Sequence, residues 1–441
     1  MDNVIVIGGG IIGLSAAYYL QQAGHRVTVL DKGDFLDNCS YGNCGYVCPS
    51  HFIPLATPGI VRQGLKWMWN PKSPFYVQPR LSRSLIDWGW KFMKSATAAH
   101  VERSAAPLRD IALLRQHEYE SWIQQPGFDF SYEHRGLLEI FQTAAGAEHA
   151  HHTVETAHRL GLSDTQLLNY EELQAKEPHT KINALGAIFF KCDAHLYPNR
   201  LMEVLRADLR QKGVALIPQE EVIRFGTSNG GTPTGGGRIS TGNSITTVET
   251  TNNHYPADAV VLATGSWSRE IAALLDTRLP LMPGRGYSVT LEDATYPSGA
   301  NGLPQAMRVN YPAILMEGRA AITPMDGNKI RFGGTMEVTS MKTPPRYNRV
   351  QGILDAVRRF FPEFDVPMPP REKIWWGYRP CSADGLPYIG RIKKYNNVVV
   401  ATGHSMLGLS LGPGTGKLVA ELVSGQPTSI DLSPFAVERF G

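Results

Sequence analysis

A glycine-rich turn near the N-terminus constrains the fold of this 441-residue chain more than any other feature. Gly8-x-Gly10-x-x-Gly13 stands between an apolar run at residues 4–7 and a helical pattern, and a second apolar run follows at residues 27–30. Such runs predict buried strands, and a strand, a helix and a strand within about 30 residues predict a βαβ unit with parallel strands. Gly8 would allow the tight turn, Gly10 would let a phosphate approach the backbone, and Gly13 would let the helix pack on the strand.

An acidic residue at the end of the second predicted strand strengthens this interpretation. Asp31 lies 18 residues after Gly13, where a carboxylate can accept hydrogen bonds from ribose hydroxyls. An acid at this position disfavours a cofactor that carries a 2′-phosphate. Together, the strands, the helix, the glycines and the acid predict that the chain binds a dinucleotide.

Two later glycine turns favour FAD over NAD as that dinucleotide. The first ends a predicted strand at residues 258–265, and the second, at residues 403–408, follows a predicted strand at 397–402 and leads into a helix. A helix N-terminus directed at the site would stabilise negative charge on a reduced flavin ring. The alternative is that both are ordinary turns at strand ends, and an NAD-dependent dehydrogenase would then be colourless.

The strand patterns of the dinucleotide-binding unit recur in the middle and at the end of the chain. Residues 105–180 are mostly helical by pattern, and residues 281–340 alternate apolar and polar side chains as in an antiparallel sheet. We therefore predict an α/β fold with an antiparallel sheet, in which a Rossmann-like FAD-binding domain is interleaved with a substrate domain. The FAD-binding domain would comprise residues 1–90, 190–275 and 370–441, and the substrate domain residues 91–189 and 276–369. Residues 226–254, rich in Gly, Thr and Asn, predict a mobile hairpin loop on the surface.

Charge and cysteine content exclude several classes of protein. Forty-three Lys and Arg against forty Asp and Glu leave a net charge of +3, too small for a nucleic-acid-binding surface. Five cysteines do not make a disulfide framework and favour a reducing compartment. No run of about 18 apolar residues predicts a transmembrane helix. The apolar N-terminus has no basic leader, and we interpret it as mature structure, not as a signal peptide.

The segment of residues 65–94 is rich in Trp, Phe and Lys. The simpler interpretation is an ordered loop and helix that pack their aromatic side chains into a core. The alternative is a surface that touches a membrane or a partner, because Trp interleaved with Lys suits a membrane interface.

Nearly the whole chain, apart from residues 226–254, carries motifs in an order shared with one superfamily of flavoproteins. The motifs are VIVIGGGIIGLSAAYYLQQAGHRVTVLDK, SYGNCG, PLATPGI, LKWMW, ATGSWS, PGRGYSVTL, KIRFGG, WWGYRPCSADGLPYIGR and NVVVATGHSMLG. In this order they resemble the small-subunit type of D-amino-acid dehydrogenase, within the D-amino-acid oxidase and glycine oxidase superfamily. The resemblance implies non-covalently bound FAD, a substrate with an amine beside a carboxylate, and its oxidation to an imine.

The same resemblance implies which residues hold the cofactor. The adenosine diphosphate half would lie on the N-terminal glycines and the acid, the adenine would contact residue 222, and the flavin ring would border residues 403–409. The implied cofactor-binding residues are Gly8, Gly10, Gly13, Asp31, Lys32, Ser40, Asn43, Gly45, Val222, Ala263, Thr264, Gly265, Gly403, Met406, Leu407, Gly408 and Leu409.

Four residues are candidates for the substrate side of the site. Arg379 matches the arginine that holds the substrate carboxylate in this superfamily, and a planar guanidinium is suited to bind a carboxylate through two hydrogen bonds. Tyr287 is a candidate for lining the substrate pocket. His404 would lie at the flavin edge, where it would tune the ring, touch the substrate or only pack. His51 is a further candidate pocket residue.

A metal site is not predicted. Cys39, Cys44 and Cys48 cluster ahead of His51, but their spacing fits neither a zinc pair nor the plant-type iron–sulfur pattern. The position of Cys381 does not match the cysteine that attaches flavin in sarcosine oxidases, so the FAD is expected to be non-covalent.

The predicted function is the FAD-dependent oxidation of a D-amino or D-imino acid. Departures from the alanine-acting relatives, GHSMLGLSL and SHFIPL, fall near the expected pocket, and SYGNCGYVCPSHFIPLA resembles relatives of hydroxyproline catabolism. They favour D-proline or cis-4-hydroxy-D-proline as the substrate. Electrons would pass to a quinone or to another acceptor such as oxygen, and the protein would be cytoplasmic, with peripheral contact at the inner face of the membrane as an option. The alternatives are a glycine or sarcosine oxidase-like enzyme and a flavin-binding subunit of a larger complex.

Overall fold

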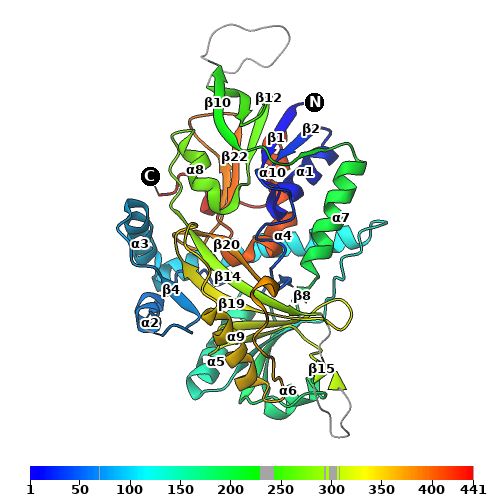
Figure 1. Ribbon diagram of the computed structural model, residues 1–441, viewed down its shortest axis with the longest axis vertical. Coiled ribbons are helices and arrows are strands. Elements are labelled where there is room, and N and C mark those ends of the chain that lie inside the picture. Colours follow the sequence, from blue (N-terminus) through cyan, green and yellow to red (C-terminus); the bar gives the residue numbers. More distant parts are fainter. Residues whose placement is uncertain (69, 229–242, 293–294, 297–304, 307, 441) are drawn as a thin grey trace.

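The computed structural model describes residues 1–440 except 69, 229–242, 293–294, 297–304 and 307 (Figure 1). The predicted βαβ unit lies in the middle of a six-stranded sheet with the order β21-β22-β13-β1-β2-β9. All neighbours pair in parallel except β21, which pairs with β22 in antiparallel at one edge. The strands are β1 (Asn3–Ile7), β2 (Arg26–Leu30), β9 (Ala215–Ile217), β13 (Ala259–Leu262), β21 (Tyr388–Arg391) and β22 (Val398–Thr402). They come from the start, middle and end of the chain, as predicted.

Helices cover one face of this sheet. They are α1 (Ile11–Gln22), α4 (Ala98–Ile123), α7 (Pro198–Gln211) and α10 (Gly408–Ser424). α1 and α10 pack closely together at Gly416. A Cβ at this position would stand 2.5 Å from the carbonyl carbon of Ser15. α4 packs against both helices: the Trp122 ring meets the Tyr18 ring edge-on at 5.0 Å, and the Tyr119 hydroxyl donates to the Leu409 carbonyl oxygen at 2.7 Å.

A small antiparallel sheet covers the opposite face, with the order β10 (Val222–Ser228), β11 (Ser244–Thr250) and β12 (His254–Pro256). Val222, Ile245 and Val248 share one core with Ile5 and Val260 of the parallel sheet. The segment 226–254 is therefore a hairpin as predicted, but its ends are strands and not loop. The middle of that segment lies outside the described residues.

The second large sheet has the order β20-β14-β19-β18-β17-β5-β7-β6, and β4 pairs with β19 beside it. Most pairs are antiparallel, as the alternation at residues 281–340 predicted, whereas β17–β5 and β19–β4 are parallel. The strands are β4 (Phe75–Val77), β5 (Leu137–Phe141), β6 (Gln166–Asn169), β7 (Gly186–Phe190), β14 (Leu281–Leu291), β17 (Ala313–Leu315), β18 (Ala320–Pro324), β19 (Ile330–Val338) and β20 (Ile374–Ser382).

The two faces of this second sheet have different environments. Helix α9 (Asn348–Phe360) covers one face, where Ile140, Leu315 and Ala320 share a core with Ile353. Side chains of a strand alternate between faces, so their neighbours in sequence point to the other side. That other face is turned toward the parallel sheet and carries the candidate site.

Three elements near two of the predicted domain boundaries pair or pack with the other layer. β20 (residues 374–382) and β4 (residues 75–77), both predicted in the FAD-binding domain, pair within the second sheet. α4, predicted in the substrate domain, packs on α1 and α10 of the first. Each of these segments packs against the layer that buries its apolar face. Composition alone does not indicate which of the two layers that is.

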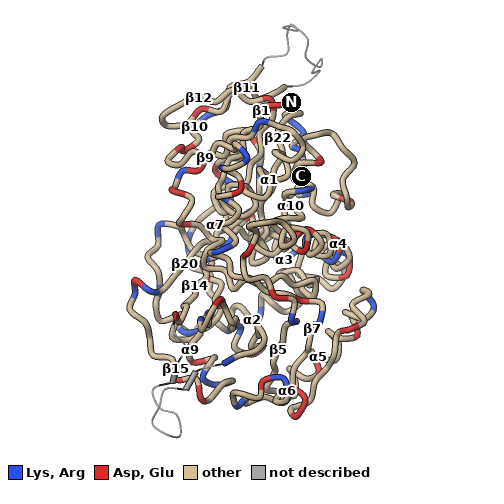
Figure 2. The backbone as a smooth tube through the Cα atoms, turned by 90° about the vertical axis from the view of Figure 1, so that its right-hand side faces the viewer, with Lys and Arg blue, Asp and Glu red and all other residues tan. Residues whose placement is uncertain are grey.

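The remaining elements join and flank the two layers. No helix in the described ranges is both long enough and apolar enough to cross a membrane. Figure 2 shows acidic and basic residues interspersed along the backbone, in line with the balanced composition. The elements are α2 (Ile60–Trp67), α3 (Arg83–Ser95), α5 (Ala144–Arg159), α6 (Tyr170–Lys176), α8 (Ser268–Ala273), β3 (Tyr46–Val47), β8 (Ala194–His195), β15 (Thr295–Tyr296), β16 (Gln305–Ala306), and the 3₁₀ turns at Gly265–Trp267, Arg371–Lys373, Ser405–Leu407 and Ser433–Phe435.

Candidate active site

One large cavity, of about 1460 Å³, lies between the carboxyl ends of the parallel strands and the second sheet. Its wall includes Gly8 and Asp31, which follow β1 and β2, and Arg379 on β20. A site for a single small ligand occupies roughly 300–1,000 Å³. The cavity is therefore large enough for a dinucleotide together with a small substrate.

The N-terminus of α1 forms one end of this cavity. Gly8 has a φ of 110°, and a Cβ there would stand 2.4 Å from the Ala263 carbonyl oxygen, so only glycine fits the turn. Gly10 caps α1, and a Cβ there would find no atom closer than the Ser40 hydroxyl oxygen at 3.7 Å. The Gly10 side of the helix end is thus open to the cavity, where free N–H groups and the helix dipole favour a phosphate.

Asp31 and Ser40 order the backbone around this helix end. The Asp31 carboxylate accepts hydrogen bonds from the backbone N–H groups of Gly9 at 2.6 Å and Gly33 at 2.7 Å. The Ser40 hydroxyl oxygen accepts one from the Ile11 N–H at 3.1 Å. Both side chains line the cavity, so they hold the turn in place while one side of each remains available to a ligand.

The predicted adenine and ribose contacts also lie on the wall. Lys32, Val222, Ala263, Thr264 and Gly265 line the cavity, and so does Asn43. Sequence reasoning missed Trp267, whose ring lies 3.8 Å below the Lys32 ammonium nitrogen. Its position in the ATGSWS motif, just after the predicted turn, was the available signal.

Three predicted cofactor residues lie behind the wall. A Cβ at Gly13 would stand 1.8 Å from the Gly8 carbonyl oxygen, one at Gly45 2.1 Å from the Leu196 carbonyl oxygen, and one at Gly403 2.8 Å from the Tyr388 ring. Their role is to let backbone and side chains pack closely, as predicted for Gly13. None of the three lines the cavity.

The loop after β22 contributes the opposite wall. Its residues from His404 to Ser410, including Met406, Leu407, Gly408 and Leu409, line the cavity and lead into α10. The His404 Nε2 lies 3.0 Å from the Thr415 hydroxyl, and Nδ1 has no hydrogen-bond partner among the described residues. Burial lowers the pKa of His404 to about 3, so the ring is neutral at physiological pH.

Arg379 lies on the cavity face of β20, above a bare stretch of sheet. Gly286 of β14 and Gly377 of β20 pair across the two strands. A Cβ at Gly286 would stand 2.2 Å from the guanidinium carbon of Arg379, and one at Gly377 would stand 2.4 Å from the Trp375 ring. The guanidinium and the indole therefore lie flat on this glycine pair, and the Arg379 Nη1 donates to the Thr335 carbonyl oxygen at 2.5 Å.

The predicted pocket residue Tyr287 lies at the border of the cavity with its hydroxyl turned away from it. Tyr287 borders the cavity, but its side chain is fully buried and belongs to the core beneath α9. Its hydroxyl lies 3.0 Å from a Glu337 carboxylate oxygen and accepts the Arg346 N–H at 2.8 Å. The buried Arg285 guanidinium completes this network. Tyr287 therefore supports the sheet from behind and does not offer its hydroxyl to a substrate.

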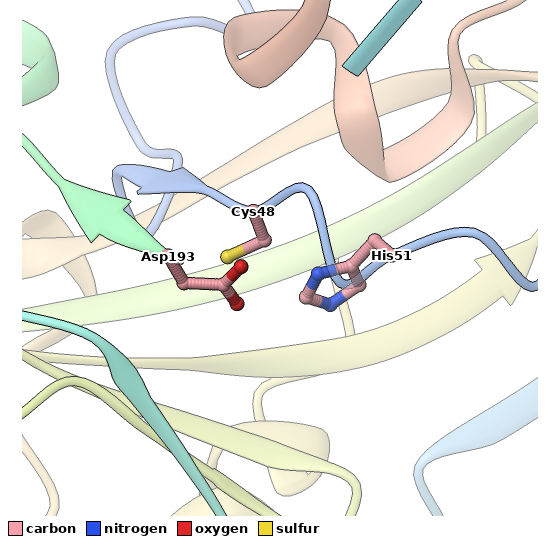
Figure 3. A group of neighbouring side chains, drawn as sticks. All are labelled: Cys48, His51 and Asp193. Atoms are coloured by element: carbon pink, nitrogen blue, oxygen red, sulfur yellow. The ribbon is translucent and has the colours of Figure 1, made fainter. Parts of the chain in front are cut away.

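The predicted pocket residue His51 does lie on the cavity wall, next to Cys48 and Asp193 (Figure 3). One ligand-type atom of each residue lies within 4.8 Å of those of the others. Burial and the nearby Arg115 lower the pKa of His51 to about 4, and burial raises that of Asp193 to about 6. The Asp193 carboxylate accepts both the N–H and the hydroxyl of Ser50.

This group gives little support to a metal site. The buried guanidinium of Arg115 acts electrostatically on all three residues and already supplies positive charge. Among the described residues, Cys39 and Cys44 do not join Cys48 in such a group. The absence of a metal stays a prediction.

Two further wall residues were missed by sequence reasoning. Trp375 lies beside Arg379, and its place in the W-x-G-x-R alternation was a signal that both share one face of a strand. Glu139 interrupts the apolar strand LLEIF and lines the cavity far from Arg379 along the sheet. A charge inside a buried apolar run was the available signal.

The residues of this cavity fit FAD. The open helix end at Gly10 can hold the pyrophosphate, and Asp31 stands at the end of β2 where a ribose would lie. The wall then continues without interruption to the unpartnered Nδ1 of His404 and to Arg379. The cofactor-binding residues and the carboxylate-binding group thus line the same cavity.

Comparisons with known proteins agree with this geometry. The family described as FAD dependent oxidoreductase (DAO) matches residues 3–422. The chain is 30% identical over 448 residues to a D-amino acid dehydrogenase of Neisseria meningitidis serogroup C, with 99% of each chain covered. It is 29% identical over 449 residues to a D-amino acid dehydrogenase of Granulibacter bethesdensis, again with 99% of each covered.

Solved structures share the fold. The glycine oxidase from Geobacillus kaustophilus has a TM-score of 0.74 at 22% identity and covers 100% of this chain and 99% of its own. The L-proline dehydrogenase from P.horikoshii has a TM-score of 0.71 at 20% identity, covering 100% and 97%. At these identities the likeness concerns the fold alone.

Proposed function

Because the chain belongs to the family of FAD-dependent oxidoreductases, it is an FAD enzyme that oxidises amino acids, and we propose that its substrates are D-amino and D-imino acids. The names of the relatives in Neisseria and Granulibacter support the D-configuration. The observation that carries the proposal is the Arg379 guanidinium, which lies flat on Gly286 inside the cavity that also holds the cofactor cradle.

Arg379 would bind and orient the substrate. A guanidinium stays charged at all relevant pH values and can donate two parallel hydrogen bonds to a carboxylate. One face of the guanidinium lies against the sheet, so a ligand can approach it only from the cavity side. Fixing the carboxylate restricts the orientation of the neighbouring α-carbon, and orientation of this kind supplies a large part of enzymatic rate enhancement.

The remaining chemistry needs few protein groups. FAD, when bound, supplies the two-electron acceptor for the hydride of the α-carbon. The substrate amine must enter neutral and lose one proton as the C=N bond forms. The rings of His404 and His51 are neutral, so neither competes with Arg379 for the substrate carboxylate. The product is an imine, which stays cyclic for a proline or hydrolyses to a 2-oxo acid.

Within this class we propose D-proline and cis-4-hydroxy-D-proline as substrates. The departures SHFIPL and GHSMLGLSL support this choice, and both segments lie on the cavity wall. The volume beside Arg379 is bounded by the apolar faces of Trp375, Cys44 and Met336, which suit a compact aliphatic ring.

Anaerobic reduction of the bound flavin tests the proposal. D-Proline, cis-4-hydroxy-D-proline, D-alanine, glycine, sarcosine and the L-enantiomers are added separately to the holoenzyme, and loss of the flavin absorbance is followed. Rapid bleaching by D-substrates is the expected result. Bleaching by glycine or sarcosine alone would overturn the substrate class, and no bleaching by any of them would favour the role of a subunit in a larger complex.

We further propose a quinone as the electron acceptor and a membrane surface as the place where it is met. From α2 to α3, residues 60–95 contain seven Lys or Arg and one acidic residue. The apolar side chains of this flank, at least 49% exposed, are Leu65, Leu81, Ile86, Trp90 and Met93. Apolar and basic groups on one surface suit a bilayer with anionic lipids.

The same flank borders the cavity. α2 and α3 lie on one side of the molecule (Figure 1) and share a core through residues such as Ile60 and Trp88. Ile60, Gln63 and Trp67 of α2 line the cavity, whereas Leu65 faces outward. A lipid-soluble acceptor held at this surface would therefore be separated from the flavin site by one short helix.

A further inference from the structure

Glu139 is a cavity-lining carboxylate that forms no hydrogen bond and no ion pair with the described residues. It lies on β5, in the run LLEIF, between buried apolar neighbours. No hydrogen bond and no ion pair from any described residue reaches its carboxylate, although most buried acids are paired. Its carboxylate faces the cavity and is available to a ligand.

The register of the second sheet fixes where Glu139 lies relative to Arg379. Directly paired residues on neighbouring strands carry their side chains on the same face. One such row crosses six strands, and all of its members except the serine line the cavity: Trp375, Ser288, Gly333, Ala321, Ile314 and Glu139. Trp375 and Glu139 are therefore the two ends of one cavity floor.

The spacing between neighbouring strands gives the length of this floor. Neighbouring strands are about 4.8 Å apart, so the three steps from Gly333 on β19 to Glu139 on β5 span about 14 Å. The Arg379 guanidinium lies over β14 and donates to Thr335 on β19, at the near end of that span. A proline ring bound at Arg379 would not cross it. A lysine-like side chain, with its four-carbon stem, would bring a cation toward the Glu139 side chain that extends from the far end.

The floor between the two ends can accommodate such a stem. Gly333 and Ala321 present almost no side chain, and Ile314 is apolar. Leu137 and Phe190 flank Glu139 on the wall. A passage with an apolar floor and a carboxylate at its end selects a ligand that is aliphatic along its length and cationic at its tip.

We propose that Glu139 forms a distal subsite that binds the ammonium or guanidinium end of a long, basic D-amino acid while Arg379 holds its carboxylate. This inference rests on the proposed function and extends it to a second substrate class. Short substrates such as D-proline occupy only the Arg379 end, and basic ones occupy both ends. Glu139 is a specificity residue and takes no part in the chemical step.

The charged groups around Glu139 give this subsite a pH dependence. Arg319 favours the ionised form of Glu139 electrostatically, whereas the buried Asp193 disfavours its ionisation. The other titratable residues on this part of the wall are His51, which is neutral, Arg159, and the exposed His149 and His152. Burial raises the pKa of Glu139 to about 7. The carboxylate form, which binds a cation, therefore gains population as the pH rises through 7.

Single-turnover reduction of the holoenzyme by matched substrates tests the subsite. D-Lysine is compared with D-norleucine, which has the same stem without the ammonium, and D-proline reports on the Arg379 end. The ratio of reduction efficiency, D-lysine over D-norleucine, is expected to fall at least about tenfold in Glu139→Gln, as for loss of a hydrogen bond between charged groups. D-Proline should remain within twofold of the wild type. Glu102→Gln, an exposed carboxylate at the rim of the same cavity, is the matched control and should change neither value.

The outcomes separate the two proposals. If no D-amino acid reduces the flavin, the proposed function fails. If D-proline or D-alanine reduces it but D-lysine is no better than D-norleucine, or if Glu139→Gln leaves their ratio unchanged, the subsite is overturned. Should Glu139→Gln not fold, the wild-type ratio measured from pH 6 to 8 decides: a rise supports the subsite and a flat profile refutes it.

Discussion

The guanidinium carbon of Arg379 lies 2.2 Å from the point where a Cβ on Gly286 would stand. Arginine and glycine thus form one unit, in which the absence of a side chain on β14 sets the height and tilt of the guanidinium on β20. We expect Gly286→Ala to displace Arg379 and to lower kcat/KM for a D-amino acid about 10- to 100-fold, since a hydrogen bond to a charged group contributes about 1.5–3 kcal/mol. Steady-state kinetics at unchanged FAD content measure the effect.

Gly89→Ala is the matched control for Gly286→Ala. It adds the same methyl group to a position where a Cβ would meet no atom within 4 Å. Wild-type kinetics are expected for it. If Gly286→Ala also kept wild-type kcat/KM, the contact between the two residues would not position the carboxylate-binding group.

The same substitution, glycine to alanine, should weaken FAD binding at Gly10 but destabilise the fold at Gly13. Gly10→Ala adds a methyl group on the open side of the α1 N-terminus, so the protein should fold and hold FAD at least about tenfold more weakly, since the methyl group denies a phosphate its backbone contact. Gly13→Ala would place Cβ 1.8 Å from the Gly8 carbonyl oxygen, and such overpacking costs about 1–3 kcal/mol or more.

Denaturant unfolding and fluorimetric titration with FAD distinguish these two glycines. The free energy of unfolding of the apoprotein should fall for Gly13→Ala and remain near the wild type for Gly10→Ala. Equal loss of stability in both variants would contradict the assignment of Gly10 to the phosphate.

The pH dependence of turnover should show no ionisation of a histidine ring. The pKa values of His404 and His51 are lowered to about 3 and about 4, so both rings stay neutral above pH 5 and neither changes charge near pH 6.5. The substrate amine must lose its proton, so kcat/KM for D-proline should rise about tenfold per pH unit from pH 6 to 8. A break in that slope near pH 6.5, abolished by His404→Gln or His51→Gln, would show that one of these rings is ionised.

Binding to membranes should depend on the outer faces of α2 and α3. Ile86 and Trp90 are 64% and 57% exposed, and neither lines the cavity, so exchanging both for serine changes only the outer surface. Co-sedimentation with vesicles that contain anionic lipid should decrease severalfold, and anaerobic reduction by a D-amino acid should stay unchanged. Leu185→Ser, at 53% exposure on another surface, is the control. Binding that is equal in all three proteins, or absent from the wild type, would refute the membrane surface.

Local sequence patterns were sufficient to predict the dinucleotide-binding half of the fold. They were not sufficient where the position of a residue depends on which strands pair with its own strand. The turn from Gly8 to Gly13, the strands at residues 258–263 and 397–402 and the position of Arg379 depend on motifs whose physics is contained within a few residues. Tyr287 did not. Its alternation with Gly286 shows that the two face opposite ways, but which face meets the cavity depends on where β19, β20 and α9 lie.

The same limit applies to three elements near the predicted domain boundaries. β20 and β4 joined the second sheet, and α4 joined the first layer, through contacts made by residues distant in sequence, such as Tyr119 with Leu409. Glu139 carried a signal, a charge within LLEIF, but its distance from Arg379 follows only from the register of five intervening strand pairs.

The close packing of α1 on α10 has a consequence for biosynthesis. β1 and α1 leave the ribosome well before β22 and the loop from His404, which complete the cavity wall and are synthesised nearly four hundred residues later. A nascent chain can form the phosphate-binding turn early but lacks the wall that encloses the ring. Cofactor loading therefore belongs to the end of translation, and a ribosome-stalled chain cut before residue 398 should emerge colourless.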